Sequence, residues 1–224
     1  MIIAIDGPAG SGKTSTARAV AEQLGFRHLE TGAFYRAITL GAIRAGIPPE
    51  KWGELTGADL DKLGFEARPD DFGFRFYLGD EDVTDALYTD QVTQRVSDMA
   101  AVPAVRTWAL GRIRAAAREA DVVADGRDMG TIVFPNADVK IFLTARPEVR
   151  ARRRLLQRGT AEPTPAAIAA ETERLTERDR KDSERATAPL RRAPDAVVVD
   201  TTSLTFDQQV ERIVGLVIRR SRRP

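Results

Sequence analysis

The sequence predicts an α/β fold in which helices flank a parallel sheet, and three observations lead to this prediction. Short apolar runs recur along the chain, as expected for strands that are buried on both faces. Segments that read as helices separate these runs, an alternation typical of a parallel sheet. A glycine-rich loop stands between the first apolar run and the first helical segment. The length of 224 residues suits one domain, 1–224, with a small insertion.

The chain is expected to begin with two strand–helix pairs. Gly25 closes the first helix, and Gly46 ends the second, two residues before a proline. The expected strands are Ile2–Ile5 and Phe26–Glu30, and the expected helices are Thr14–Leu24 and Thr31–Ala45.

Residues from about 57 to 96 are expected to form an insertion in a core made of residues 1–56 and 97–224. Within this insertion, FEAR and FRFYL read as strands, GDED as a turn and VTDAL as a further strand. These segments predict a small antiparallel sheet.

The second half of the chain is expected to complete the parallel sheet. A helix is predicted near Pro103–Ala120, and arginine-rich helices lie between the last two strands. One of these helices begins at Thr164 and Pro165, a pair that suits a helix N-cap and the first helical position. The three apolar runs are Val122–Asp125, Val139–Ala145 and Ala196–Asp200.

The loop GPAGSGKT at residues 7–14 matches the phosphate-binding pattern G-x-x-x-x-G-K-[ST]. Its glycines let the backbone wrap around phosphate oxygens, and the positive end of the following helix favours their charge. Lys13 would reach the β- and γ-phosphates, and the Thr14 hydroxyl would bind Mg²⁺. The residues expected to bind ATP are Gly7, Pro8, Ala9, Gly10, Ser11, Gly12, Lys13, Thr14 and Ser15.

Three classes of protein share such a loop: small-molecule kinases, GTPase switches and ATPase modules. A GTPase carries N-K-x-D to read guanine, and the only asparagine here, Asn136, precedes Ala137. An ATPase module places acidic residues after an apolar strand, and VVVD at 197–200 fits that pattern, but its place near the C-terminus favours an ordinary core strand. The length and the later arginines favour a small-molecule kinase.

The arginines also indicate which kind of group accepts the phosphoryl. The single histidine, His28, lies in an expected buried strand, where a packed core role is ordinary. A phosphate monoester needs no general base, but unit charges about 4 Å apart repel by roughly 4 kcal/mol at an effective dielectric near 20. Arginine counters this repulsion because it keeps its charge and grips phosphate oxygens through two N–H groups. The sequence therefore points to a phosphate acceptor.

The 34 basic residues nearly balance the 33 acidic residues, whereas a nucleic-acid binder usually carries a clear basic excess. The absence of cysteine excludes disulfides and thiolate metal sites. No apolar run reaches 18 residues, so no membrane partner is expected. The strand that follows Met1 leaves no room for a signal peptide, so we expect a cytoplasmic protein.

Five motifs occur in a particular order: GPAGSGKT, TGAFYRA at 31–37, ADGRDMGTIVFPNADVKIFL at 124–143, RDRKDSERATAPL at 178–190 and DAVVVDTT at 195–202. Over nearly the whole chain, their order and spacing resemble the bacterial cytidylate kinases. The resemblance implies a P-loop nucleoside monophosphate (NMP) kinase fold, with a five-stranded parallel core, an enlarged NMP-binding insertion and a short lid. It also implies transfer of the γ-phosphoryl of ATP to CMP or dCMP, with Mg²⁺ required. An adenylate-type kinase and an ATPase module are the alternatives.

The resemblance further implies roles for single residues. Thr31 would lie near the pyrimidine ring and Arg106 would contact it, while Arg36 would hold the acceptor phosphate. Asp128 would accept a hydrogen bond from the exocyclic amine that distinguishes cytosine from uracil. The implied CMP-binding residues are Thr31, Arg36, Arg106, Arg127, Asp128, Arg178, Asp182 and Arg185, and the implied catalytic residues are Lys13, Arg127 and Arg185.

The spacing of Arg178, Asp182 and Arg185 predicts that they share one helix face. Two other residues depart from the family pattern: Glu30 stands where aspartate is usual, and Tyr88 where relatives often carry arginine. The lid is expected at about 150–165, and a monomer is the default for this fold. The sequence leaves open the relative use of dCMP and UMP, and which lid arginines contact phosphate among Arg150, Arg152, Arg153, Arg154 and Arg158.

Overall fold

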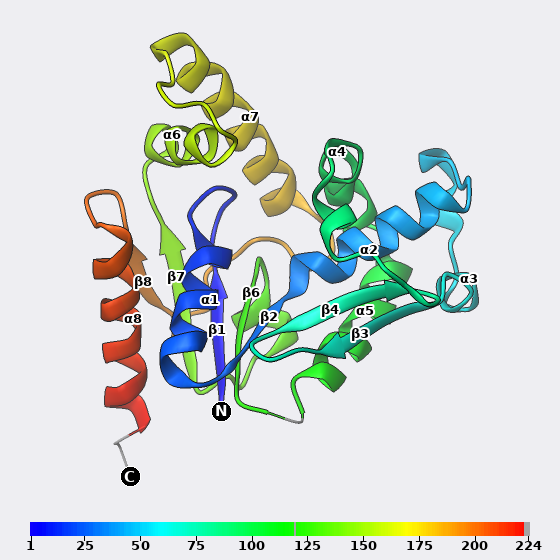
Figure 1. The fold of residues 1–224 in the computed structure, drawn as a ribbon, viewed down its shortest axis with the longest axis horizontal. Coiled ribbons are helices and arrows are strands. Elements are labelled where there is room, and N and C mark those ends of the chain that lie inside the picture. The colour runs from blue at the N-terminus through cyan, green and yellow to red at the C-terminus, as the bar shows by residue number, and fades with distance from the viewer. Residues whose placement is uncertain (119, 222–224) are drawn as a thin grey trace.

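A five-stranded parallel sheet forms the centre of the protein, in the order β2-β6-β1-β7-β8 (Figure 1). The computed structural model describes residues 1–118 and 120–221. The predicted α/β class, the parallel sheet and its five strands are confirmed, and each predicted strand end is correct to within one residue. The strands are β1 Ile2–Asp6, β2 Arg27–Glu30, β6 Val122–Gly126, β7 Val139–Thr144 and β8 Val197–Asp200.

Helices cover both faces of the sheet because β1 alternates its side chains between two cores. Ile3 and Ile5 pack in the core that includes α1 (Lys13–Leu24) and α8 (Phe206–Ser221). Ala4 faces the other core, which holds α2 (Thr31–Arg44) and α5 (Pro103–Ala116). The helix predicted at 103–120 is shorter in the structure, because α5 ends at Ala116. Residue 119 of that prediction lies outside the described residues.

Two further helices, α6 (Pro147–Gln157) and α7 (Pro165–Glu184), stand beyond the carboxyl ends of the strands (Figure 1). The predicted start of α7 is confirmed: Thr164 is its N-cap, and the Thr164 hydroxyl accepts a hydrogen bond from Ala167 N–H. The predicted lid range, 150–165, covers most of α6 and the loop to α7. Among residues 1–118 and 120–221, no helix is long and apolar enough to cross a membrane.

The predicted insertion, residues 57–96, contains the predicted antiparallel sheet, made of β3 (Phe65–Pro69), β4 (Phe74–Leu78) and β5 (Glu81–Asp82). The prediction of a strand at VTDAL is wrong. The chain reverses within two residues after Leu78, so the third strand falls inside the predicted turn, and Asp85–Tyr88 forms a 3-10 helix. The shorter helical elements of this region are η1 (Pro49–Glu54), α3 (Gly57–Asp61) and α4 (Asp90–Met99).

The last strand differs from the prediction in its burial. β8 lies at the edge of the parallel sheet and pairs with β7 alone. Val197 is 42% exposed and Val198 is 38% exposed. The prediction of a strand buried on both faces is therefore wrong for β8, because an edge strand gains its partner on one side only.

An aromatic cluster joins the insertion to the core. The Phe34 ring of α2 lies 5.3 Å from the Phe76 ring, edge to face, and 5.5 Å from the Phe65 ring. The Phe65 ring in turn lies 5.6 Å from the Trp108 ring of α5. Buried aromatic pairs of this kind contribute beyond their area. The inserted sheet is therefore fixed to α2 and α5, the helices that carry Arg36 and Arg106.

Phe34→Ala should lower the free energy of unfolding by about 3–5 kcal/mol, because it leaves a cavity where Phe34 is fully buried. Urea denaturation followed by circular dichroism measures this loss. Phe72→Ala is the matched control, since Phe72 is 57% exposed and should change stability by less than about 0.5 kcal/mol. Equal effects of the two substitutions would contradict the role given to Phe34.

Candidate active site

The phosphate loop begins directly after β1 and ends at the first turn of α1. Gly7 has φ 153°, and a Cβ there would lie 2.0 Å from the Leu143 carbonyl oxygen of β7. Gly12, the N-cap of α1, has φ 86°. Gly7 leaves no space for a side chain, and both Gly7 and Gly12 have a positive φ that other residues rarely adopt. The sequence motif therefore fixes a close approach of the loop to the sheet.

Lys13 is buried and folds back over its own loop. Its Nζ donates to the Pro8 carbonyl oxygen at 2.7 Å and lies 3.5 Å from Ser11 Oγ. Burial lowers the pKa of Lys13, and the nearby charge of Arg127 lowers it further. A phosphate would supply the opposite charge that this ammonium group needs.

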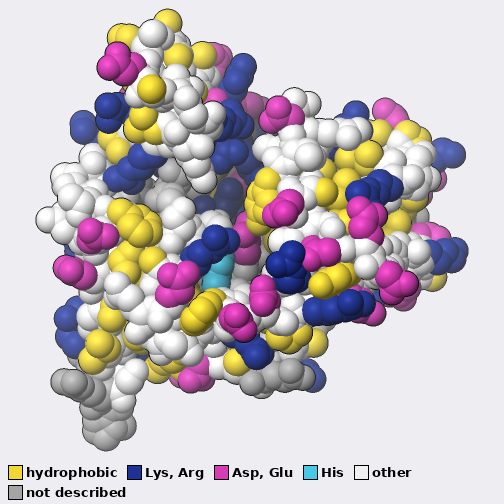
Figure 2. All heavy atoms as spheres, viewed as in Figure 1, with side chains coloured by type: hydrophobic (Ala, Val, Ile, Leu, Met, Phe, Trp, Pro, Cys, Tyr) yellow, Lys and Arg dark blue, Asp and Glu magenta, His cyan; other side chains and the backbone are white. Residues whose placement is uncertain are grey.

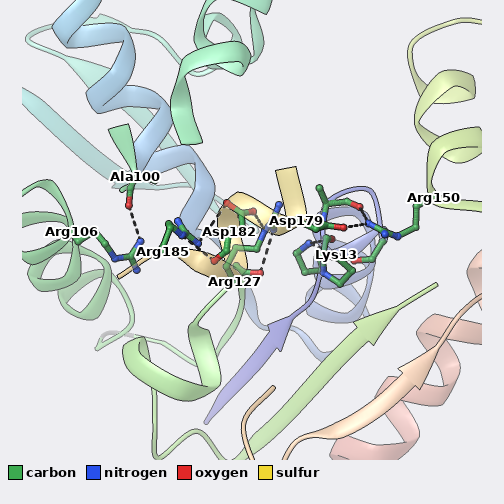
Figure 3. A network of polar contacts seen from close by, with 12 residues as sticks. Lys13, Ala100, Arg106, Arg127, Arg150, Asp179, Asp182 and Arg185 are labelled. Carbon is green, nitrogen blue, oxygen red and sulfur yellow. Dashed lines mark hydrogen bonds and ion pairs between the residues drawn. The ribbon is translucent and has the colours of Figure 1, made fainter. Parts of the chain in front are cut away.

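Two helices hold the phosphate loop from outside (Figure 3). Asp179 Oδ1 of α7 accepts a hydrogen bond from Ala9 N–H at 2.7 Å, and Asp179 Oδ2 lies 2.6 Å from Arg150 Nη1. Arg150 Nη1 also donates to the Ala9 carbonyl oxygen at 2.6 Å. Arg150 is therefore part of the loop's support. Asp179 was not predicted, and nothing in its sequence pattern sets it apart from neighbouring acids.

A cavity of about 90 Å³ brings together seven of the eight predicted CMP-binding residues. They come from α2, α5, the loop after β6, α7 and the residue after α7, which are far apart in sequence. A second cavity of about 570 Å³, between α4 and α7, shares Ser97 and Arg178 with the first. Figure 2 shows Lys and Arg side chains gathered in the hollow between α7 and α4. The seven residues are Thr31, Arg106, Arg127, Asp128, Arg178, Asp182 and Arg185.

Asp182 organises two of the arginines in the small cavity (Figure 3). Its Oδ2 accepts from Arg127 Nε at 2.8 Å, and its carbonyl oxygen accepts from Arg185 Nε at 3.3 Å. Burial raises the pKa of the Asp182 carboxyl, but the charges of Arg127 and Arg185 lower it overall. Asp182 is therefore an ionised anchor for the guanidinium groups.

Arg106 and Asp128 form a buried ion pair on the far side of the same cavity. Arg106 is 6% exposed and Asp128 is 3% exposed. Burial raises the pKa of Asp128, although the charge of Arg106 counteracts this. The Arg106 guanidinium also lies 5.4 Å from the centre of the Tyr35 ring. A hydrogen-bond donor, Arg106, and an acceptor, Asp128, thus lie side by side in the cavity next to the Tyr35 ring.

The cavity carries more positive charge than its carboxylates balance. Two buried guanidinium nitrogens, Arg178 Nε and Arg185 Nη2, have no hydrogen-bond partner within residues 1–118 and 120–221, and Arg185 Nη2 has only an ion pair at 3.7 Å with Asp182 Oδ1. Burial and the charge of Arg127 lower the pKa of Arg178 to about 10, so Arg178 stays protonated at neutral pH. Buried polar groups without partners are rare in folded proteins. An anionic ligand would satisfy both nitrogens.

The predicted helix face is correct for two residues and wrong for the third. α7 ends at Glu184, and Arg185 is its extended C-cap with ψ 134°. The chain then turns back, so that Leu190 N–H donates to the Asp182 carbonyl oxygen at 2.8 Å. Arg185 nevertheless lines the same cavity as Arg178.

Arg36 is the one predicted CMP-binding residue that the small cavity does not include. Its Nη1 donates to the Leu87 carbonyl oxygen at 3.0 Å and to Thr93 Oγ1 at 2.9 Å. Its guanidinium lies 5.1 Å from the centre of the Tyr88 ring, and Tyr88 OH donates to Glu30 Oε2 at 2.7 Å. The two residues that depart from the family pattern thus contact one another and support Arg36.

The predicted metal ligand Thr14 contacts a carboxylate that was not predicted. Thr14 Oγ1 donates to Asp125 Oδ2 at 2.9 Å, and Asp125 is 4% exposed at the carboxyl end of β6. Hydroxyl and carboxylate oxygens are the donors that Mg²⁺ prefers. The residues present therefore fit this ion. No group of three or more His, Asp or Glu residues that could hold a metal occurs in the described ranges.

The sequence did hold a signal for Asp125. VVAD at 122–125 is an apolar run ending in an acid, the pattern considered above only for VVVD at 197–200. β6 is the neighbour of β1, so its end lies beside the phosphate loop, whereas β8 lies two strands away from β1.

A cavity of about 350 Å³ lies on the other side of the phosphate loop. Gly10, Gly12 and Ser15 line it together with Phe206, which is 47% exposed. Two arginines of the predicted lid, Arg153 and Arg154, line this cavity. Arg153 Nη2 donates to the Thr201 carbonyl oxygen at 2.7 Å, whereas Arg154 also lines the cavity between α4 and α7. Arg154 thus lies between the two cavities.

Comparison with known proteins agrees with this geometry. The family model for cytidylate kinase matches residues 3–219. A cytidylate kinase from Mycolicibacterium paratuberculosis is 45% identical over 227 residues, covering 99% of this chain and 96% of the relative. A cytidylate kinase from Geobacillus kaustophilus is 45% identical over 218 residues, covering 97% and 96% respectively.

One solved structure, an uncharacterized protein from Eubacterium ventriosum, is similar in fold alone. It has a TM-score of 0.51 and 12% identity, and the match covers 97% of this chain and 98% of that protein. Family membership rests on the sequence relatives, which match along almost the full length. With its phosphate loop, its arginine-lined cavity and these relatives, the chain belongs to the cytidylate kinase family.

Proposed function

We propose that the protein transfers the γ-phosphoryl of MgATP to CMP or dCMP, giving ADP and CDP or dCDP. The observation that carries this proposal is the convergence of Arg127, Arg178 and Arg185 in one cavity beside the phosphate loop. An arginine cluster with unpartnered nitrogens suits a second phosphorylated ligand next to the nucleotide bound by Lys13.

The donor site is formed by residues 7–15. Backbone N–H groups of the loop would surround the ATP phosphates, and the start of α1 would favour their charge. The adenosine part would occupy the cavity of about 350 Å³ that Phe206 lines, because an exposed aromatic ring there offers a surface for a base. Gly12 and Ser15 belong to the phosphate loop and also line that cavity. The phosphates and the adenosine of ATP would therefore occupy adjoining sites.

The acceptor would enter the small cavity with its base and extend into the larger cavity beyond Ser97. About 90 Å³ is too small for a nucleotide, since small-molecule pockets are typically about 300–1,000 Å³. Asp128 would accept from the cytosine amine and Arg106 would donate to the ring, while Arg178 and Asp182 would contact the ribose. Arg36 would reach the acceptor phosphate after releasing its contacts to the insertion.

In the reaction, a phosphate oxygen of CMP attacks the γ-phosphorus of ATP, and the bond to the β–γ bridging oxygen breaks. Lys13, Arg127 and Arg185 would stabilise the charge that spreads over the transferred group. Thr14 and Asp125 would hold Mg²⁺, which would supply further charge neutralisation when bound. No protein base is required because the attacking oxygen is already ionised.

Closure of the lid, residues 150–165, would exclude water before transfer. Arg154 is the lid arginine best placed to act, because it lines the cavities on both sides of the transfer path. Its pKa is lowered by burial and by the charge of Arg158, which a bound phosphate would offset. We further propose that the enzyme acts as a cytoplasmic monomer in pyrimidine nucleotide metabolism, without nucleic acid or membrane.

A coupled assay of ADP release with CMP, dCMP, UMP, AMP and GMP tests the proposed reaction. The expected result is high activity with CMP and dCMP, because Asp128 suits an amine and the cavity suits a pyrimidine. Highest activity with AMP would replace this proposal with an adenylate-type kinase. ATP hydrolysis that no monophosphate changes would indicate an ATPase module.

Lys13→Ala should lower kcat roughly 100- to 1,000-fold, because it removes a charge from the transition state. The KM for CMP should change little, since Lys13 would contact ATP alone. Steady-state kinetics at saturating MgATP give both constants. Lys51→Ala, an exposed lysine of η1, is the control and should leave kcat unchanged. A near-normal kcat for Lys13→Ala would refute the role of Lys13.

Asp128→Asn should reduce the preference for CMP over UMP by roughly tenfold or more, because the amide of asparagine can donate to the uracil carbonyl. The ratio of kcat/KM for the two monophosphates measures this preference. Asp195→Asn is the matched control, since Asp195 lies on the surface and pairs with Lys140. An unchanged ratio in Asp128→Asn would show that another group reads the base.

A further inference from the structure

His28 is the only histidine in the chain, and it is 5% exposed at strand β2. Its Nε2 lies 2.8 Å from Asp125 Oδ1. Because an ionised carboxylate can only accept hydrogen bonds, Nε2 carries the hydrogen in this contact. The ordinary core role predicted for His28 is therefore incomplete, since its ring makes one specific polar contact.

The contact partner, Asp125, is held from three directions. Its Oδ1 meets His28, its Oδ2 accepts from Thr14 Oγ1 at 2.9 Å, and its backbone carbonyl oxygen accepts from Thr31 Oγ1 at 2.7 Å. β2 and β6 are parallel neighbours in which Glu30 pairs with Asp125, so the sheet fixes the backbones that carry His28 and Asp125. The carboxylate thus has one oxygen anchored in the core and the other beside the phosphate loop.

We propose that His28 is a positioning residue for MgATP: it fixes the rotation of the Asp125 carboxylate so that Oδ2 stays beside Thr14. This inference rests on the proposed function, in which Thr14 and Asp125 hold the Mg²⁺ of ATP. Thr14 has only a short side chain, and it reaches Asp125 from the first turn of α1. The alignment of the two oxygens therefore depends on what holds Asp125.

Neither of two nearby ionisable residues, Glu30 and Lys13, is placed to replace His28 as the hydrogen-bond donor to Asp125 Oδ1. Glu30, two residues along β2, is an acid, and its pKa is raised by burial and by the charge of Asp125. Its Oε2 already accepts a hydrogen bond from Tyr88 OH, and an ionised Glu30 would repel the Asp125 carboxylate instead of donating to it. Lys13 is charged and near, but its Nζ is held by the Pro8 carbonyl oxygen. Without His28, Oδ1 would lose its only hydrogen-bond donor in the described part of the chain.

Residues that orient metal-binding carboxylates typically change metal affinity by about 10- to 100-fold when they are replaced. The experiment measures the binding of ATP by isothermal titration calorimetry, without CMP, once with Mg²⁺ and once with EDTA. The ratio of the two affinities is the gain from Mg²⁺. In His28→Leu, which matches the size and removes the donor, this gain should fall about tenfold or more.

His28→Gln is the matched conservative variant, because its amide nitrogen reaches about as far as Nε2 and can donate. It should recover most of the gain from Mg²⁺. Affinity for ATP in EDTA and affinity for CMP should be unchanged in both variants. Asp125→Asn is the positive control and should lose the gain, since an amide oxygen replaces the charged ligand.

Three results would overturn the inference. His28→Leu could keep the full gain from Mg²⁺, or it could lose ATP affinity equally in Mg²⁺ and in EDTA, as a purely structural residue would. His28→Gln could also fail to recover any gain although it melts at the temperature of the wild type. The outcome is separate from the proposed function, because ATP binding is measured without an acceptor, whereas the proposed reaction fails only when CMP releases no ADP.

Discussion

An excess of positive charge in one cavity is the constraint on which the rest of the site depends. Four guanidinium groups, those of Arg106, Arg127, Arg178 and Arg185, line a cavity with two carboxylates. Guanidinium groups this close together repel one another unless carboxylates or a ligand offset their charge. Asp182 anchors two of the four groups, and the aromatic contacts between the insertion and the core fix the helix that carries Arg106. The remaining charge favours an anionic ligand, and that ligand would complete the folded site.

The parallel sheet supplies the second requirement, which is to bring two ligands together. The carboxyl ends of β1, β2 and β6 lie side by side because these strands are parallel neighbours. The phosphate loop leaves β1, Thr31 follows β2, and Arg127 follows β6. Ligands of α/β sheets bind at such ends, where a change in strand order opens a crevice. Here β1 lies between β6 and β7, so the chain segments that follow these two strands lie on opposite sides of the phosphate loop.

Local patterns in the sequence predicted local structure well and long-range contacts poorly. The glycine motif and the five apolar runs were correct because they depend on residues close together in the chain. VTDAL was misread because Gly79, with φ 60°, reverses the chain sooner than the turn GDED suggested. VVAD at 122–125 carried the local signal for Asp125, but its importance depends on β6 lying next to β1, which no local pattern states. The contact between Glu30 and Tyr88 is of the same kind, since 58 residues separate the two side chains.

In the proposed function, the Arg106–Asp128 pair would link the charge of the cavity to selectivity for the base. Arg106 and Asp128 pair with each other, so each holds the other in place. Cytosine offers an amine donor beside a ring nitrogen acceptor, and it could take one hydrogen bond from each partner without leaving a buried charge alone. Uracil offers a carbonyl where the amine would be, so Asp128 would face a second acceptor and lose its partner. In the proposed function this buried ion pair would act as a template, because its two charges are best satisfied by a ligand with the opposite order of donor and acceptor.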